Sequence, residues 1–290
     1  MKLDDVPFNL DVTLCCGQVF RWEKKNDWWY SVAGDRAFKI RQCNPELEFA
    51  NADTKFIVNY FGLDDDLKKI RDDVSKDEHI QKALQQFWGL RIIRQEPWEC
   101  LVSYICATYK SITAIKRMLF KLSEKFGRKI SLDNHDFYTF PTPEKLAKTT
   151  ESALMDCGLG YRAKYLLETS RRIIENNFSL EGLRKMPYQQ AKKELVNFSG
   201  VGLKVADCIL LFSLGKHEAF PVDIWIKRVI LQHYAAHFPK AFIEKISSHE
   251  SLSNAEYERL NEFGRIYFGK YAGYAQEYLY YYQRTQSKQQ

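Results

Sequence analysis

The chain has 290 residues, of which 45% are apolar and 28% charged, so it can bury a core and is too apolar to be disordered. It opens without an apolar leader, and its longest apolar run, residues 205–214, is about half a membrane span. These features favour an intracellular protein of the cytoplasm or nucleoid, or of the nucleus in a eukaryote, with no membrane partner.

Charge is spread unevenly within the net +6: residues 1–87 carry 13 Lys/Arg against 16 Asp/Glu, whereas residues 88–290 carry 30 against 21. The basic surplus of the later part favours a polyanion partner, although a solvated basic surface explains it nearly as well.

Cysteine usage excludes two classes of site. Seven cysteines, an odd number, lack any C-x-x-C pair, so neither a disulfide framework nor a zinc site is indicated. None follows Cys208, which excludes a four-cysteine iron–sulfur motif in the C-terminal region. We expect reduced and mostly buried thiols.

The first 60 residues predict strands and turns, because aromatic and β-branched stretches alternate with turn formers such as Gly34-Asp35. From Asp53 the apolar spacing becomes helical, and GLRIIRQ after Trp88 can return to the sheet. Residues 1–95 are therefore predicted to form a small antiparallel sheet domain with helices.

Residues 96–290 are predicted to be helical, beginning with a helix that starts at Pro97. Thr142-Pro143 begins another helix, Gly158 and Gly160 end one, and the C-terminal helix YAGYAQEYLYYYQR is rich in tyrosine. The fold class predicted is α+β, with a sheet domain followed by an all-helical domain.

A helix-hairpin-helix is predicted at about residues 189–215, where AKKELVNF and LKVADCILLFSL flank the turn SGVG. Gly200 and Gly202 can take positive φ and let the backbone approach another group. Amides at the start of the second helix then favour a phosphate. By itself this pattern also fits an ordinary αα-corner.

Two side chains beside the hairpin suggest amine chemistry. Lys204 lies in the first turn of the second helix, where the positive end of the helix dipole is expected to lower its pKa and favour a nucleophilic amine. Asp223 opens the next helix as an N-cap, so it is held ionised and can also stabilise positive charge opposite it. The alternatives are a solvated lysine and a purely structural cap.

NFSGVGLKVADC followed by FPVDIWIKRV resembles the signature of the helix-hairpin-helix DNA glycosylases. CGQVFRW, GLRIIRQEPWECLVSYIC, DCGLGYRAKY and GKYAGYAQEYLY narrow the resemblance to the 8-oxoguanine DNA glycosylases of eukaryotic type, over about residues 7–282.

The resemblance implies roles for individual residues. Lys204 would be the nucleophile and Asp223 the second catalytic residue. The residues expected to bind the lesion are Gly17, Cys208, Pro221, Gln276 and Tyr280. Those expected to contact DNA are Tyr109, Tyr161, Arg162, Gly200, Val201, Gly202 and Trp225.

Some positions depart from the family pattern. Tyr109 and Ala114 stand where the family usually has a gap-filling asparagine and an arginine that reads the opposite cytosine, while Tyr161 and Arg162 match its wedge and second cytosine reader. Losing one arginine predicts relaxed preference for cytosine. Trp225 and Ser199 replace a histidine and a proline, which affects the expected phosphate contacts.

The function predicted is a monomeric, bifunctional base excision repair enzyme, a DNA N-glycosylase and abasic-site lyase acting on double-stranded DNA that contains 8-oxoguanine. No metal or organic cofactor is expected for the chemistry, although a cation could bind hairpin carbonyls at a phosphate. The alternatives are a glycosylase for another oxidised or alkylated base and a non-catalytic DNA-binding protein.

Overall fold

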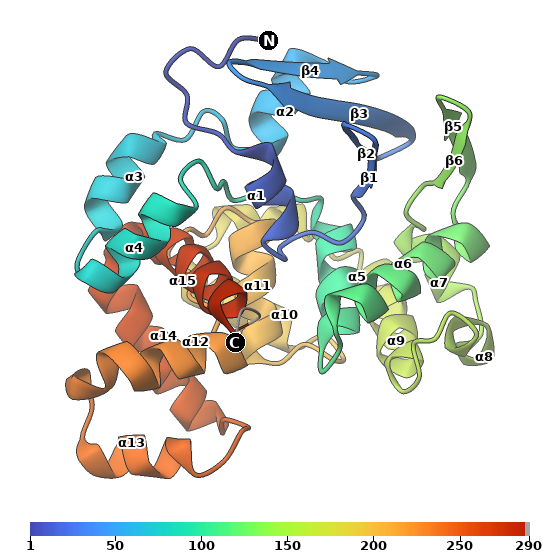
Figure 1. Ribbon diagram of the computed structural model, residues 1–290. Coiled ribbons are helices and arrows are strands. Elements are labelled where there is room, and N and C mark those ends of the chain that lie inside the picture. The colour runs from blue at the N-terminus through green and yellow to red at the C-terminus, as the bar shows by residue number, and fades with distance from the viewer. Residues whose placement is uncertain (288–290) are drawn as a thin grey trace.

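Tight two-residue turns organise the N-terminal sheet in the computed structural model, which describes residues 1–287 (Figure 1). Asn26 and Gly34 take positive φ in the turns that join the first three strands. The strands pair antiparallel in the order β1-β2-β3-β4. Elements up to residue 86 are α1 (Leu10–Cys15), β1 (Glu23–Lys25), β2 (Trp28–Ala33), β3 (Arg36–Cys43), β4 (Glu46–Ala50), α2 (Thr54–Tyr60), α3 (Leu67–Val74) and α4 (Glu78–Gln86).

One face of this sheet is buried by α1 and α2. Trp29, Phe38 and Ile40 alternate along β2 and β3 and pack with Leu10 of α1 and Ile57 of α2. The sheet itself lies at the top of Figure 1, above most of the helical part.

Helices make up nearly all the rest, and most begin with a capping side chain or a proline. Beyond residue 96 the helices and strands are α5 (Pro97–Ala107), α6 (Ile112–Phe126), β5 (Lys129–Leu132), β6 (His135–Tyr138), α7 (Pro143–Ala147), α8 (Glu151–Met155), α9 (Arg162–Glu175), η1 (Glu181–Lys185), α10 (Tyr188–Val196), α11 (Leu203–Phe212), α12 (Ile224–Val229), η2 (Ile230–Tyr234), η3 (Ala235–His237), α13 (Lys240–Ser247), α14 (Asn254–Phe268), η4 (Gly269–Tyr271) and α15 (Ala272–Gln286). This agrees with the α+β class predicted from the sequence.

The tyrosine-rich helix α15 lies in the middle of the larger core, where it packs against α3, α4, α12 and α14 (Figure 1). Its buried Tyr274 donates a 2.9 Å hydrogen bond to Asp65, and Tyr278 donates to the carbonyl of Leu90. The C-terminal helix is thereby fastened to segments that precede residue 95. The predicted division at that residue stays a prediction.

Three local predictions were wrong. Residues 90–96 form no strand, because their amides bond to scattered partners: that of Ile93 to the Gln18 side chain, and that of Gln95 to the carbonyl of Phe212. A short helix, α1, precedes the sheet, and the hairpin β5–β6 interrupts the helical part. Among residues 1–287, no helix is long and apolar enough to cross a bilayer.

A buried polar network anchors α11 to its neighbours. The carboxylate of Asp207 is inaccessible to solvent and accepts hydrogen bonds from Tyr188 (2.5 Å), Tyr257 (2.6 Å) and Asn261 (3.1 Å). The ammonium of Lys192 lies 3.1 Å away. Because α10 and α14 supply these partners, the network sets where α11 lies against them.

We expect Asp207→Asn to lower the free energy of unfolding by about 2 kcal/mol or more, because the buried ammonium of Lys192 then keeps only the half-exposed carboxylate of Glu258, 3.1 Å away, as its counter-charge. Asp136→Asn breaks an exposed 2.8 Å pair with Lys129 and should cost less than about 1 kcal/mol. Urea denaturation followed by circular dichroism measures both, and equal costs would contradict the anchoring role.

Candidate active site

A cavity of about 680 Å³, here named the lysine cavity, brings together most of the residues singled out in the sequence. It lies among α11, α12, α15 and the segments before them. Predicted site residues that line it are Gly17, Tyr109, Gly200, Gly202, Lys204, Cys208, Pro221, Asp223, Trp225, Gln276 and Tyr280. Val201, Tyr161 and Arg162 do not line it.

Lys204 is the second residue of α11, and its ammonium lies 5.3 Å from the centre of the Tyr104 ring. Burial lowers its pKa, but the neighbouring Cys208 and Asp223 favour the ammonium more strongly, so the pKa is raised. The prediction that the helix N-terminus lowers this pKa was therefore wrong. The amine must lose a proton before it can attack.

Asp223 is the N-cap of α12, as predicted, and its Oδ1 accepts hydrogen bonds from the amides of Trp225 and Ile226, both at 2.9 Å. Burial raises the pKa of its carboxyl, while Lys204 and the two amides oppose that rise. The cap aims the carboxylate at the cavity that Lys204 also lines.

The wall of the lysine cavity opposite Lys204 is formed by residues near the two ends of the chain. Gly17 has φ +116°, and a Cβ there would lie 3.3 Å from the Tyr280 hydroxyl, so the position favours glycine. Gln276 is only 4% exposed, and no donor among the described residues reaches its Oε1. A buried acceptor without a donor is suited to a ligand that brings one.

The hairpin turn differs in detail from the sequence expectation. Gly200 takes positive φ (+80°) against the ring of Tyr165, but Gly202 has φ −87° and caps α11. The amide of Val201 donates to the carbonyl of Phe198, so it is not free for a phosphate. No side chain caps α11, which leaves its first amides for a ligand.

Three residues predicted to contact DNA differ in their exposure to solvent. Tyr109 is 85% exposed with φ +53°, and Tyr161 is 53% exposed. Arg162 is buried, donates to the carbonyl of Thr108, and stacks on Tyr161 at 4.4 Å. The two tyrosines are therefore presented to solvent, whereas Arg162 is held inside.

Glu277 and Arg284 on α15 were missed by the sequence analysis. Glu277 lines the lysine cavity, is 2% exposed, and has an oxygen without a donor among residues 1–287. Burial raises the pKa of its carboxyl to about 7, while Cys16 and Arg284 oppose the rise. The helical spacing of Glu277, Tyr280 and Arg284 (i, i+3, i+7) was the available signal.

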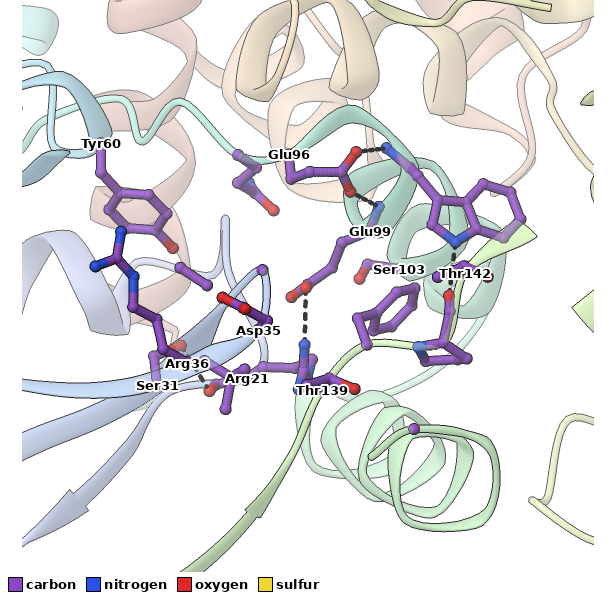
Figure 2. A pocket seen from close by; sticks show the side chains of 18 of the residues that line it. Arg21, Ser31, Asp35, Arg36, Tyr60, Glu96, Glu99, Ser103, Thr139 and Thr142 are labelled. Carbon is purple, nitrogen blue, oxygen red and sulfur yellow. Dashed lines mark hydrogen bonds and ion pairs between the residues drawn. The ribbon is translucent and has the colours of Figure 1, made fainter. Parts of the chain in front are cut away.

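A larger cavity of about 1150 Å³ lies between the sheet and α5 and shares only Phe20 with the lysine cavity (Figure 2). Two of its acidic groups already have structural partners, since Glu99 pairs with Arg21 at 2.7 Å and Glu96 caps α5, while Asp35 is exposed to solvent. The lysine cavity is therefore the better candidate for chemistry.

Two family models match consecutive regions of the chain. Residues 1–101 match the family described as "8-oxoguanine DNA glycosylase, N-terminal domain". Residues 102–248 match the "HhH-GPD superfamily base excision DNA repair protein" family.

The similarity to known proteins extends over almost the whole chain. A Saccharomyces cerevisiae N-glycosylase/DNA lyase is 33% identical over 92% of this chain and 81% of its own length. N-glycosylase/DNA lyase OGG1 of Arabidopsis thaliana is 28% identical, covering 97% and 78%. A crystal structure of Clostridium acetobutylicum 8-oxoguanine glycosylase/lyase, in complex with DNA containing cytosine opposite 8-oxoG, aligns with TM-score 0.87 and 33% identity over 97% of this chain and 93% of that chain.

We expect Glu277→Gln to flatten the pH dependence of stability. Because folding raises the pKa of Glu277 from its ordinary 4.5 to about 7, its stabilising contribution is complete below pH 4.5 and is lost as the pH rises through 7. The free energy of unfolding of the variant should therefore rise relative to that of the parent protein across this pH range, by up to about 3 kcal/mol at pH 8.

Urea denaturation at pH 5 and pH 8 measures this gain, with the exposed Glu262→Gln as the matched control. A difference between variant and parent that stays constant with pH would contradict the raised pKa.

Proposed function

Because the chain belongs to the 8-oxoguanine DNA glycosylases of the helix-hairpin-helix superfamily, we propose that it excises 8-oxoguanine from duplex DNA by attack of Lys204 on the sugar. The enzyme then cleaves the strand at the abasic site that results. One observation carries the assignment of residues: Lys204, Asp223, Gly17 and Gln276, which lie far apart in the sequence, line a single cavity.

The proposed reaction starts with extrusion of the damaged nucleotide, because a base within the duplex cannot reach the cavity. Lys204 loses its ammonium proton, and its amine attacks C1′ while the bond between C1′ and the base breaks. The bonding electrons leave with the base, which takes up a proton. Asp223, already aimed by its helix, stabilises the positive charge that develops on the sugar.

Strand cleavage follows from the same covalent bond. Ring opening converts the adduct into a Schiff base, which makes the neighbouring sugar proton acidic. Loss of that proton and departure of the 3′ phosphate is a β-elimination, and water then releases Lys204. Both steps need one lysine, which is why a single cavity serves a glycosylase and a lyase.

We assign recognition of the damaged base to the cavity wall opposite Lys204. 8-Oxoguanine carries an N7 hydrogen where guanine has a lone pair, so one carbonyl, that of Gly17, can separate them. The unpartnered Oε1 of Gln276 is available for the Watson–Crick edge. Cys208 and Tyr280 are assigned to the two faces of the base, and Pro221 packs beside them along the cavity.

Backbone contacts are assigned to the hairpin and the tyrosines. Amides that begin α11 after Gly202 bind a phosphate, with Trp225 at the start of α12 nearby in the cavity lining. Tyr161 acts as the wedge. We propose that the enzyme acts as a monomer. Because its proposed substrate is DNA, we expect it in the compartment that holds the DNA, which is the cytoplasm or nucleoid, or the nucleus in a eukaryote.

The base opposite the lesion is proposed to be read weakly. Tyr109 projects into solvent where it can fill the gap in the duplex, but Ala114 has no group to bond a base. Arg162 would have to leave the carbonyl of Thr108 to reach the opposite strand. Preference for cytosine then rests on one arginine at most.

Borohydride should trap the parent protein covalently on duplex DNA containing 8-oxoguanine, and Lys204→Gln should abolish the adduct because the amide cannot form a Schiff base. Lys193→Gln, at an exposed position of α10, is the matched control and should be trapped normally. Denaturing gel electrophoresis reads the result. An adduct with Lys204→Gln, or none with the parent protein, refutes the proposed chemistry.

Excision opposite cytosine and opposite adenine should differ by less than about tenfold in single-turnover assays, because few groups are available to read the opposite base. Ala114→Arg should raise the ratio by about 10- to 100-fold, whereas Thr113→Arg adds the same charge at the neighbouring exposed position and should not. A parent ratio of several hundredfold overturns the relaxed preference.

A further inference from the structure

Arg284 joins the two ends of the chain behind the lysine cavity. It lies near the end of α15 and is 8% exposed. One guanidinium nitrogen, Nη2, donates a 2.9 Å hydrogen bond to the carbonyl of Cys15, which is 269 positions away in the sequence. The other, Nη1, donates a 2.9 Å bond to the hydroxyl of Tyr280, one turn earlier on the same helix.

These bonds connect the two parts of the recognition wall. Cys15 is two residues before Gly17, so fixing its carbonyl restricts the backbone at Gly17. A Cβ at Gly17 would lie 3.3 Å from the Tyr280 hydroxyl, which shows how closely the two parts meet. The guanidinium also lies over the Tyr280 ring, 5.1 Å from its centre.

The position of Arg284 does not suit a phosphate contact. Its side chain is nearly enclosed, and both terminal nitrogens already donate to protein acceptors. Burial lowers the pKa of the guanidinium, but Tyr280 and Glu277, one and two turns earlier on the same helix, both favour its charged form, so the pKa is raised. A planar, two-pronged donor is the side chain that can bond a carbonyl and a hydroxyl at once.

We propose that Arg284 is a positioning residue for lesion recognition, which fastens the Cys15–Gly17 backbone to Tyr280 and so sets the spacing between the carbonyl that reads the base and the ring that stacks on it. This inference rests on the proposed function of the cavity. The proposal predicts that substitutions of Arg284 slow excision of the base much more than cleavage of the strand. Excision needs the wall because a base must be bound there, whereas cleavage of a preformed abasic site presents no base.

The test compares Arg284→Ala, Arg284→Lys and Tyr280→Phe with the parent protein on two duplexes. On 8-oxoguanine opposite cytosine, single-turnover excision should fall about 10- to 100-fold in Arg284→Ala, because two charge-assisted hydrogen bonds are lost. Arg284→Lys should recover only part of the rate, since an ammonium lacks the planar fork. On a preformed abasic site, strand cleavage by Arg284→Ala and by Arg284→Lys should stay within about threefold of the parent rate.

Tyr280→Phe keeps the stacking ring and removes one of the two bonds, so it should give a smaller loss of excision. The double variant Arg284→Ala/Tyr280→Phe should be no slower than Arg284→Ala alone, because both changes break the same contact. Thermal unfolding checks that each protein is folded. If Arg284→Ala does not fold, Arg284→Lys and Tyr280→Phe carry the test.

Equal losses of excision and of abasic-site cleavage in Arg284→Ala overturn the proposal, and so does unchanged excision by that variant. The proposal also fails if the effects of Arg284→Ala and Tyr280→Phe on excision simply add in the double variant. Failure of the proposed function has a different signature. In that case the parent protein itself neither excises 8-oxoguanine nor cleaves the abasic site.

Discussion

The proposed chemistry depends on a lysine that the cavity keeps charged until a substrate arrives. Lys204 lies in the first turn of α11, where burial lowers its pKa, yet Cys208 and Asp223 around it more than offset that effect. The cavity and the residues behind it hold two cations, Lys204 and Arg284, and two carboxyl groups, Asp223 and Glu277. Asp223 favours the charged form of Lys204, whereas a pKa of about 7 leaves Glu277 partly protonated at neutral pH.

The fold supplies this arrangement through two anchored helices. Asp207 fastens α11 to α10 and α14, which places Lys204 and Cys208 on the face toward the cavity. Helix α15 is fastened at Tyr274 and Tyr278 to segments before residue 95 and brings Gln276 to the opposite side. The cavity lies between these helices, so its width is set by buried hydrogen bonds outside it.

Much of this could be predicted from the sequence, because local patterns carry it. Glycine spacing indicated the hairpin, and the position before an apolar helix indicated the cap formed by Asp223. What could not be predicted depends on long-range contacts. Residues 90–96 have a strand-like composition, but their amides bond to scattered partners. Arg162 is a residue type that often contacts DNA, but here it is buried and donates to the carbonyl of Thr108. The raised pKa of Glu277 likewise arises from burial in the folded protein, which no local pattern reports.

Reading a base with one backbone carbonyl makes a particular demand on a protein. In the proposed recognition the carbonyl of Gly17 has no side chain to adjust its reach, so discrimination would depend on where the backbone lies. Glycine at this position is the most flexible residue available, and φ +116° is a conformation that it alone adopts easily. Flexibility and accurate placement conflict unless a neighbour restrains the loop. Arg284 bonds the carbonyl two residues earlier, where the restraint does not occupy the group that the base must meet.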